Sequence, residues 1–453
     1  MMGASRTSRF VLVAFALVGS ACASTETART AQPPEAPRAP VPKKSPPPEP
    51  PAAAPEGAAS TERPERPQEP PLKPAHAGAQ VYAATSGKGD ERLVAPDRLR
   101  VGIVKDVIAL AKREHRPKPV GDPRLDAAMN DLAHNLRGDD LPSLEVIDFL
   151  LTHYGIAEPS PHLLLSRATA GADREIRAQV LKQVEAVYKQ SPVARIGVGV
   201  DRTGDLMYAV VALQETHVAL ERVPRRLEAG ASTAVEGKLT GRYRDARVVV
   251  TSPDGKVAEQ EPSARKGWVR GKIACATSGK YQVEVMAEDV HGTAVLANFP
   301  IYCAVDPPAL APRAAGTHVG RASVDRVEKE VLALVNRDRA AAGLQPVVWD
   351  ERLAAIARAH SRDMAEHDYV GHVSPRTGTA LDRVRKGGLD PGLVLENVAL
   401  ALSAQEVESG FMSSPGHRAN VVEPRATRLG VGVTPGTPVS GAVPLYFTQV
   451  FTN

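Results

Sequence analysis

The chain has 453 residues, enough for about three domains, and its 56 basic and 52 acidic side chains leave a net charge of +4. Aromatic residues make up only 4% of the chain, and no basic run is interleaved with them, which argues against a nucleic-acid-binding surface. The near balance of charge favours no other class of partner.

The first 22 residues have the layout of a secretory signal peptide. Arg6 and Arg9 precede an apolar run over residues 10–18, and small residues follow up to Cys22. That run is shorter than the roughly 20 apolar residues that span a bilayer. The segment VGSAC resembles a bacterial lipoprotein box, although Gly19 stands where Leu is usual. We therefore expect export and lipidation of Cys22, with ordinary cleavage that discards Cys22 as the alternative.

Residues 23–78 are expected to form a Pro-rich linker. The stretch from 31 to 74 holds 16 of the 39 prolines, and its only large aliphatic side chains are Val41 and Leu72. Such a segment cannot bury a core and extends by about 3.1 Å per residue. Behind a lipidated cysteine, it would hold the folded part away from a membrane.

Three folded regions are expected after the linker. Residues 79–224 begin with helical spacing, as in GDPRLDAAMNDLAHNL, and end in two strands around a turn. Residues 225–307 alternate apolar and polar positions between turn signals, which is typical of a small β-sandwich. Residues 308–320 are expected to be a linker, and residues 321–453 return to helices followed by strands.

The chain has two cysteines besides Cys22. Cys275 and Cys303 both fall in strands expected for the β-region. An oxidising compartment could bridge this pair, so we expect a disulfide. Two buried thiols are the alternative.

Two short motifs recur in the first and last folded regions. DPRLDAAM at 122–129 parallels DERLAAIA at 350–357, and RIGVGV at 195–200 parallels RLGVGV at 428–433. The matched motifs lie at nearly equal separations in the two regions. This predicts two copies of one fold with the β-region between them, and chance similarity is the alternative.

Residues 321–453 have the pattern of an α+β domain. A helix that begins after Asp350 places His360 on its apolar face, which favours a core histidine. Ser403 and Glu406 stand at capping-box spacing, so Glu406 is expected to cap a helix. The segments RLGVGVT and AVPLYFTQVFTN are expected strands, which gives helices flanking a sheet.

Six segments of this region resemble the CAP superfamily of cysteine-rich secretory, antigen 5 and pathogenesis-related proteins, in its bacterial extracellular branch. They are LVNRDRAAAGLQPVVWDERLAAIARAHSRDM, YVGHVSP, ENVA, SPGHRAN, LGVGV and FTQVF, in family order. The resemblance implies an α-β-α sandwich with an open cleft over residues 321–453. Combined with the repeat, it implies a degenerate CAP-like α+β domain at 79–224, which lacks the GHVSP, ENVA and GHR motifs.

The resemblance also implies which residues line the cleft. The family's cleft typically holds two histidines and two acids, which bind a divalent metal in some members. His372 in GHVSP and Glu396 in ENVA match the first histidine and the first acid. Ser414 and Tyr446 occupy the slots of the second acid and the last histidine, and His417 is what the bacterial branch offers instead.

Several roles are open to these residues. His372, Glu396 and His417 can ligate a divalent metal such as Zn²⁺ or Ca²⁺, or act as an acid–base group without metal. In the structural alternatives, His417 bonds backbone at a helix end, and Glu396 pairs with Arg418 or His417. Asn397 is expected to line the cleft and satisfy backbone groups there.

Three functions follow, of which a binding module is favoured. In it, an exported cell-envelope lipoprotein holds a lipid, a wall component or a protein surface in its CAP cleft. The second is a metal-dependent hydrolase of envelope material, and the third is a structural or adhesive stalk. Nucleophilic catalysis has little support, because no Ser sits in a Gly-x-Ser-x-Gly elbow.

Overall fold

A computed structural model describes residues 14–15, 24–27, 71–84, 93–136, 142–190, 192–262, 265–290, 292–311, 323–367, 369–437 and 443–453. Cys22 and most of the predicted signal peptide and linker lie outside these ranges. Within them, no helix combines the length and the apolar character needed to cross a bilayer.

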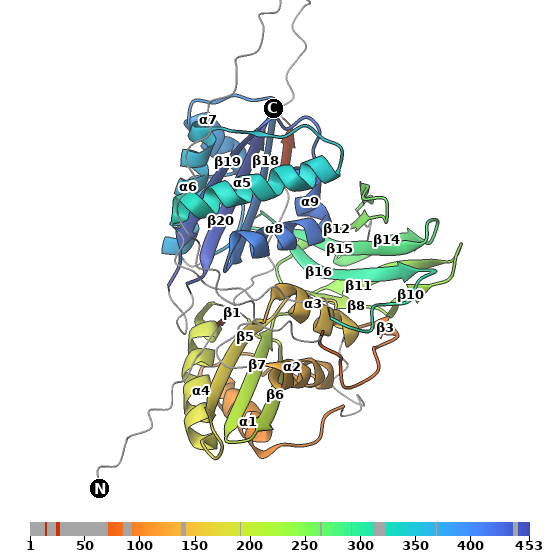
Figure 1. Cartoon of the computed structure of the whole chain (residues 1–453), viewed down its shortest axis with the longest axis vertical. Helices are drawn as coiled ribbons and strands as arrows, with labels where there is room; N and C mark the ends of the chain where they lie inside the picture. The colour runs from red at the N-terminus through yellow and green to blue at the C-terminus, as the bar shows by residue number, and fades with distance from the viewer. Residues whose placement is uncertain are drawn as a thin grey trace, which may run out of the picture. The chain divides into compact units, whose positions relative to one another are not determined.

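The first folded region consists of helices around a five-stranded sheet (Figure 1). The helices are α1 (Arg98–Arg113), α2 (Pro123–Asn135), α3 (Leu144–His153) and α4 (Asp173–Gln190). The sheet order is β1-β5-β7-β6-β4, formed by β1 (Ala14–Phe15), β4 (Val120–Gly121), β5 (His162–Thr169), β6 (Arg195–Thr203) and β7 (Leu206–Gln214). Strands β4 and β6 are parallel, and the other pairs are antiparallel.

This region begins earlier than the sequence predicts. The N–H of Ala75 donates to a carboxylate oxygen of Asp131 at 3.2 Å, and the N–H of Ala79 donates to the carbonyl of His153 at 2.8 Å. The segment from residue 71, predicted as linker, is therefore hydrogen-bonded to the first region. Ala311, in the second predicted linker, likewise donates from its N–H to the carbonyl of Leu72 at 2.9 Å.

The middle region consists of two sheets that share one apolar cluster. The larger has the order β10-β16-β15-β12-β13, and the smaller has the order β14-β11-β8. A short β3–β9 pair joins the first region to this one. The strands are β3 (Val81–Tyr82), β8 (Val218–Leu220), β9 (Val223–Pro224), β10 (Arg226–Leu227), β11 (Ser232–Leu239), β12 (Arg244–Thr251), β13 (Val257–Glu259), β14 (Trp268–Ala274), β15 (Gly279–Asp289) and β16 (Gly292–Cys303).

The two cysteines of the middle region are free thiols in this structure, and not the predicted disulfide. Both are buried in the apolar cluster between the sheets. Burial and the adjacent Cys275 thiol together raise the pKa of Cys303 to about 12. The two side chains are thus neighbours, as the prediction required, but no bond joins them.

The C-terminal region has three layers, with helices on both faces of a sheet (Figure 1). The sheet order is β17-β19-β20-β18-β2, formed by β2 (Ser24–Thr27), β17 (Val348–Trp349), β18 (Leu393–Ala401), β19 (Arg428–Pro435) and β20 (Leu445–Thr452). Apolar side chains of α5 (Val324–Ala341), α8 (Ala404–Ser413) and α9 (Pro415–Val421) pack on one face. Those of α6 (Glu351–Glu366) and α7 (Ala380–Lys386) pack on the other.

Two glycines bring β19 into direct contact with α6. A Cβ added to Gly430 would lie 2.2 Å from the N of Ala354, and one added to Gly432 would lie 2.1 Å from the N of Arg358. Helix and strand backbones therefore touch, as two strand glycines allow. The first region repeats this arrangement, because a Cβ on Gly199 would lie 2.0 Å from the carbonyl oxygen of Met129 in α2.

The two regions also share their strand order. The order β5-β7-β6-β4 has the same sequence of antiparallel, antiparallel and parallel pairings as β18-β20-β19-β17. In both sheets, the strand that comes last along the chain lies between two others.

Candidate functional site

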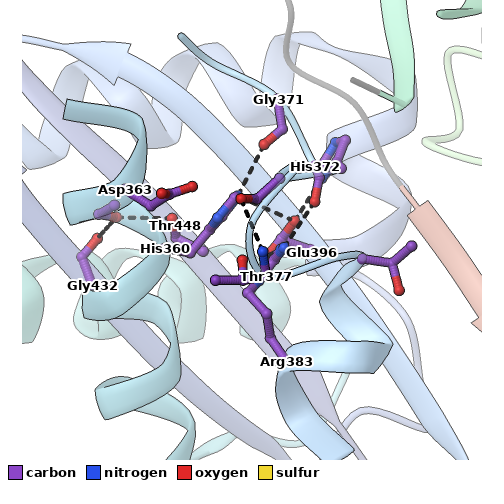
Figure 2. A network of polar contacts seen from close by, with 12 residues as sticks. His360, Asp363, Gly371, His372, Thr377, Arg383, Glu396, Gly432 and Thr448 are labelled. Carbon is purple, nitrogen blue, oxygen red and sulfur yellow. Dashed lines mark hydrogen bonds and ion pairs between the residues drawn. The ribbon is translucent and has the colours of Figure 1, made fainter. Parts of the chain in front are cut away.

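His372 and Glu396 meet at the face of the sheet that α6 and α7 cover. His372 lies in the loop between these helices, Glu396 lies on β18, and His372 Nδ1 is 2.8 Å from Glu396 Oε1. Arg383 of α7 reaches the other carboxylate oxygen, with its Nη2 2.6 Å from Glu396 Oε2. Figure 2 shows Glu396 between the imidazole and the guanidinium.

The Arg383 guanidinium fixes the loop as well as the carboxylate. Its Nη1 donates to the carbonyl of His372 at 3.0 Å and to the carbonyl of Gly378 at 2.6 Å. Burial alone would raise the pKa of Glu396, but the charge of Arg383, with His360 and His372, lowers it to about 2. Glu396 is therefore an ionised, fully buried carboxylate with both oxygens in use. The predicted pairing of Glu396 with Arg418 or His417 is wrong, because His372 and Arg383 occupy its oxygens.

His360 is a buried core histidine on α6, in agreement with its apolar stripe. Its Nε2 is 2.9 Å from the carbonyl oxygen of Gly371 and 4.0 Å from Glu396 Oε1. Burial lowers the pKa of His360 to about 4, so the ring is neutral. It packs beside the carboxylate and anchors the loop that carries His372.

His417 lies in the first turn of α9, where Ser414 is the N-cap. The Ser414 Oγ accepts from the N–H of His417 at 3.5 Å and lies 2.7 Å from its ring Nδ1. Burial, with repulsion from nearby His372, lowers the pKa of His417 well below its usual value. The ring is therefore a neutral imidazole, and its partner is the capping hydroxyl instead of a backbone group.

A chain of buried amides runs beside these histidines. Asn397 Nδ2 donates to the carbonyl of His417 at 3.3 Å and to Gln449 Oε1 at 3.0 Å. Asn420 Nδ2 donates to Asn397 Oδ1 at 2.9 Å, and Gln449 Nε2 donates to Glu408 Oε2 at 2.9 Å. Asn397 thus satisfies a backbone group as predicted, and the amides fix α9 against β18 and β20.

Two other predicted residues have different surroundings. Ser414 adjoins His417, whereas Tyr446 packs in an apolar cluster with Met364, Val398 and Leu400. Glu406 behaves as a helix cap, because its N–H donates to Ser403 Oγ at 3.1 Å while its Oε2 accepts from the N–H of Leu402 at 2.6 Å. Sequence reasoning missed Arg383 and Glu284, and no local spacing marks either one.

The predicted ligands do not fit a metal ion. Both carboxylate oxygens of Glu396 already contact His372 and Arg383. The guanidinium, 2.6 Å away, would repel a divalent cation. No group of three or more His, Cys, Asp or Glu side chains in the described ranges is arranged to hold a metal. The arrangement of His372, Glu396 and His417 therefore does not fit the expected metal site.

Strands β15 and β16 of the middle region pack against the part of the site that contains His372 and α9. A Cβ added to Gly292 at the start of β16 would lie 3.3 Å from His372 Cβ. Glu284 of β15 is fully buried, and its Oε2 accepts from the N–H of Gly416 in α9 at 3.0 Å. His372 and His417 are therefore enclosed by a region outside the C-terminal domain.

A cavity of about 570 Å³ adjoins His417. Its walls come from α3 and the segment that follows it, from β15 and β16, and from β18, α8 and α9. His417, Ser414 and Glu284 are all in its lining, together with many apolar side chains. The volume lies within the range of about 300–1,000 Å³ that small-molecule sites occupy. His372 and Glu396 do not line it.

Comparisons with known proteins place the C-terminal region in a family. Residues 332–451 match the model of the cysteine-rich secretory protein family, CAP. An uncharacterized protein of Bacillus subtilis, YkwD, is 37% identical over 126 residues, 28% of this chain and 49% of its own length. The uncharacterized membrane protein YlbC of the same species is 37% identical over 107 residues, 23% of this chain and 31% of its own length.

Solved structures were matched as well. An extracellular protein containing an SCP domain from Bacillus anthracis is 17% identical, and the match covers 70% of this chain and 98% of that one with a TM-score of 0.28. The matched part of this chain spans about half of the length of YkwD and about a third of the length of YlbC. Residues 332–451 belong to the CAP superfamily.

Proposed function

We propose that the protein is an exported binding protein of the cell envelope, whose CAP domain supplies one wall of a ligand cavity. The observation that carries the proposal is the position of His417 and Ser414 in the lining of the cavity of about 570 Å³. Apolar side chains with a few converging polar groups are what small-molecule sites present.

The chemistry around His372 and Glu396 supports binding over catalysis. His372 and Glu396 form a buried network with Arg383, and each of these side chains is at most 6% exposed. A general acid or base must lie within hydrogen-bond reach of the proton that it transfers. These side chains instead hold the loop and β18 in place, which makes them a structural support for the wall that α9 forms.

Export and anchoring are supported by the N-terminal sequence. Its two arginines, short apolar run and VGSAC segment match a lipoprotein signal, and the Pro-rich stretch that follows would space the folded part from a membrane. In this proposal Cys22 carries the lipid. The ligand then comes from the envelope, as a lipid, a wall component or part of a protein.

The first region acts in this proposal as a second cavity wall on a CAP-like scaffold without the histidine motifs. Its support is the shared strand order and the pair of glycines, Gly197 and Gly199, against α2. Leu144 and Phe149 of α3 line the cavity from this side. A scaffold that keeps its packing but lacks the histidines suits a supporting role.

The test uses Nile red, a neutral dye whose fluorescence rises in apolar surroundings, with the full chain. Gly410 of α8 lines the cavity, and a Cβ added there meets no heavy atom within 4 Å. Gly410→Trp should fill the cavity and abolish the dye signal, whereas the matched control Gly410→Ala should keep it. Equal signals from both variants would refute the proposal and favour a structural stalk.

A further inference from the structure

Three buried side-chain atoms in the lining of the cavity share one property. Glu284 Oε1, Glu406 Oε1 and His417 Nε2 have no hydrogen-bond partner among the described residues. Each of these side chains belongs to a residue that is at most 6% exposed. A buried polar atom without a partner destabilises the folded protein, so these positions favour a ligand that completes their hydrogen bonds.

One tautomer of the His417 ring, with its proton on Nδ1, makes Nε2 an acceptor. Ser414 Oγ lies 2.7 Å from His417 Nδ1, and when this ring nitrogen is the donor, the serine oxygen accepts its proton. The neutral imidazole then carries a lone pair on Nε2. Glu284 and Glu406 present carboxylate oxygens, so in this tautomer all three unpartnered atoms accept hydrogen bonds.

The charges in the cavity lining have one predominant sign. Five acidic residues line it, of which Glu158 is paired with the buried Arg195, and Lys280 is the one Lys or Arg side chain among the lining residues of the described structure. Burial raises the pKa of Glu284 to about 7, since its described contacts, Ser414 and Gly416, supply no cation. A positive group beside Glu284 would stabilise its ionised form and so offset the effect of burial.

The rest of the lining is apolar. It includes Leu144, Phe149, Ile156, Val295, Leu400 and Phe411, which come from all three folded regions. Burying a hydrocarbon chain against such a surface is favourable by about 25 cal/mol per Å² of apolar area. The ligand therefore needs an apolar body as well as a donor-bearing head.

We propose that the cavity binds an amphipathic molecule with a primary ammonium head, which donates to Glu284 and His417 while its hydrocarbon body lies against the apolar wall. The inference rests on the proposed binding function and names the chemistry of its ligand. A primary ammonium suits two acceptors in one cavity lining because it carries three donors. A carboxylate head would meet the same acceptors with no donor to offer them.

The test compares three probes that share one hydrocarbon chain, namely dodecylamine, dodecanol and laurate. Each is titrated into the full chain below its micelle concentration, and its Kd is measured by displacement of Nile red. We expect dodecylamine to bind most tightly and laurate most weakly. Laurate binding as tightly as dodecylamine would overturn the inference and would leave the proposed function standing.

A substitution tests the contact directly. Glu284→Gln keeps an oxygen for the N–H of Gly416 but removes the charge. It should weaken dodecylamine on the order of ten-fold or more and leave dodecanol nearly unchanged. Glu406→Gln gives a second, independent variant, and Glu261→Gln is a control that removes an exposed acid outside the cavity.

The remaining outcomes are also decisive. An equal loss of dodecylamine and dodecanol in Glu284→Gln, with unfolding curves unchanged, would contradict a charge-based contact and overturn the inference. If none of the three probes displaces Nile red, the inference falls, while dye binding blocked by Gly410→Trp would still support the cavity itself. If Nile red does not bind either, both proposals fail.

Discussion

Replacing Arg383 with methionine should destabilise the CAP domain far more than the loss of a surface ion pair would. The substitution leaves Glu396 as a buried carboxylate without its cation, and it removes the donor to the carbonyls of His372 and Gly378. Removing one partner of a buried ion pair costs about 3–5 kcal/mol. With a urea slope of about 2 kcal/mol per M, the unfolding midpoint should fall by roughly 2 M.

The assay can isolate the C-terminal region because the chain has two tryptophans, Trp268 in the middle region and Trp349 on β17. In a Trp268→Phe background, fluorescence reports unfolding around Trp349 alone. Arg425→Met is the matched control, because Arg425 pairs with Glu423 at 2.7 Å at the surface and should contribute only about 0–1 kcal/mol. A midpoint shift for Arg383→Met no larger than that of the control would refute this reasoning.

A double substitution distinguishes charge from packing. Arg383→Met with Glu396→Gln removes both charges, so it should recover part of the stability that Arg383→Met alone loses. If the double variant is less stable by the sum of the two single effects, the two residues do not interact energetically. That result would contradict the contact of 2.6 Å as a source of stability.

Three further results are expected. Since the pKa of Glu396 is lowered from 4.5 to about 2, its ionisation stabilises the fold above about pH 4.5. The urea midpoint of unfolding, followed by Trp349 fluorescence, should therefore fall as the pH drops from 4.5 toward 2. In Glu396→Gln this fall should be less steep. Gly432→Ala forces a Cβ to 2.1 Å from backbone and should cost about 3 kcal/mol in the same assay, whereas Gly410→Ala should gain roughly 0.5–1 kcal/mol. Because Cys275 and Cys303 are free thiols, a thiol titration of the protein unfolded without reductant should count both of them, and the loss of both from the count would contradict this state.

Local sequence patterns predicted the parts of the site that depend on one element. The apolar stripe of α6 identified His360 as a core residue, and that side chain is buried. The motif resemblance brought His372 and Glu396 together, and their atoms do lie 2.8 Å apart. Each of these features was predicted either from the spacing of apolar residues or from the resemblance of a motif to a known family.

The parts that the sequence did not predict depend on distant segments. Arg383 stands 13 positions before Glu396 in the chain, on a short helix whose orientation no local pattern fixes. Glu284 lies 132 positions before its partner Gly416, and a different folded region carries it. The cavity is lined by residues of all three regions, so no single stretch of sequence contains its signal. Expecting metal ligands failed for the same reason, since the guanidinium that competes for Glu396 comes from another element.

The strand order affects how the chain can fold during synthesis. In the sheet of the CAP domain, β20 lies between β19 and β18 and pairs with both. These two strands therefore cannot join one sheet until residues 445–452 have left the ribosome. Helices α5 to α9 are synthesised earlier, and their apolar faces stay exposed until the sheet is complete. Such non-local pairing folds slowly and leaves intermediates exposed to aggregation. Losing residues 445–452 would therefore remove a central strand of the sheet.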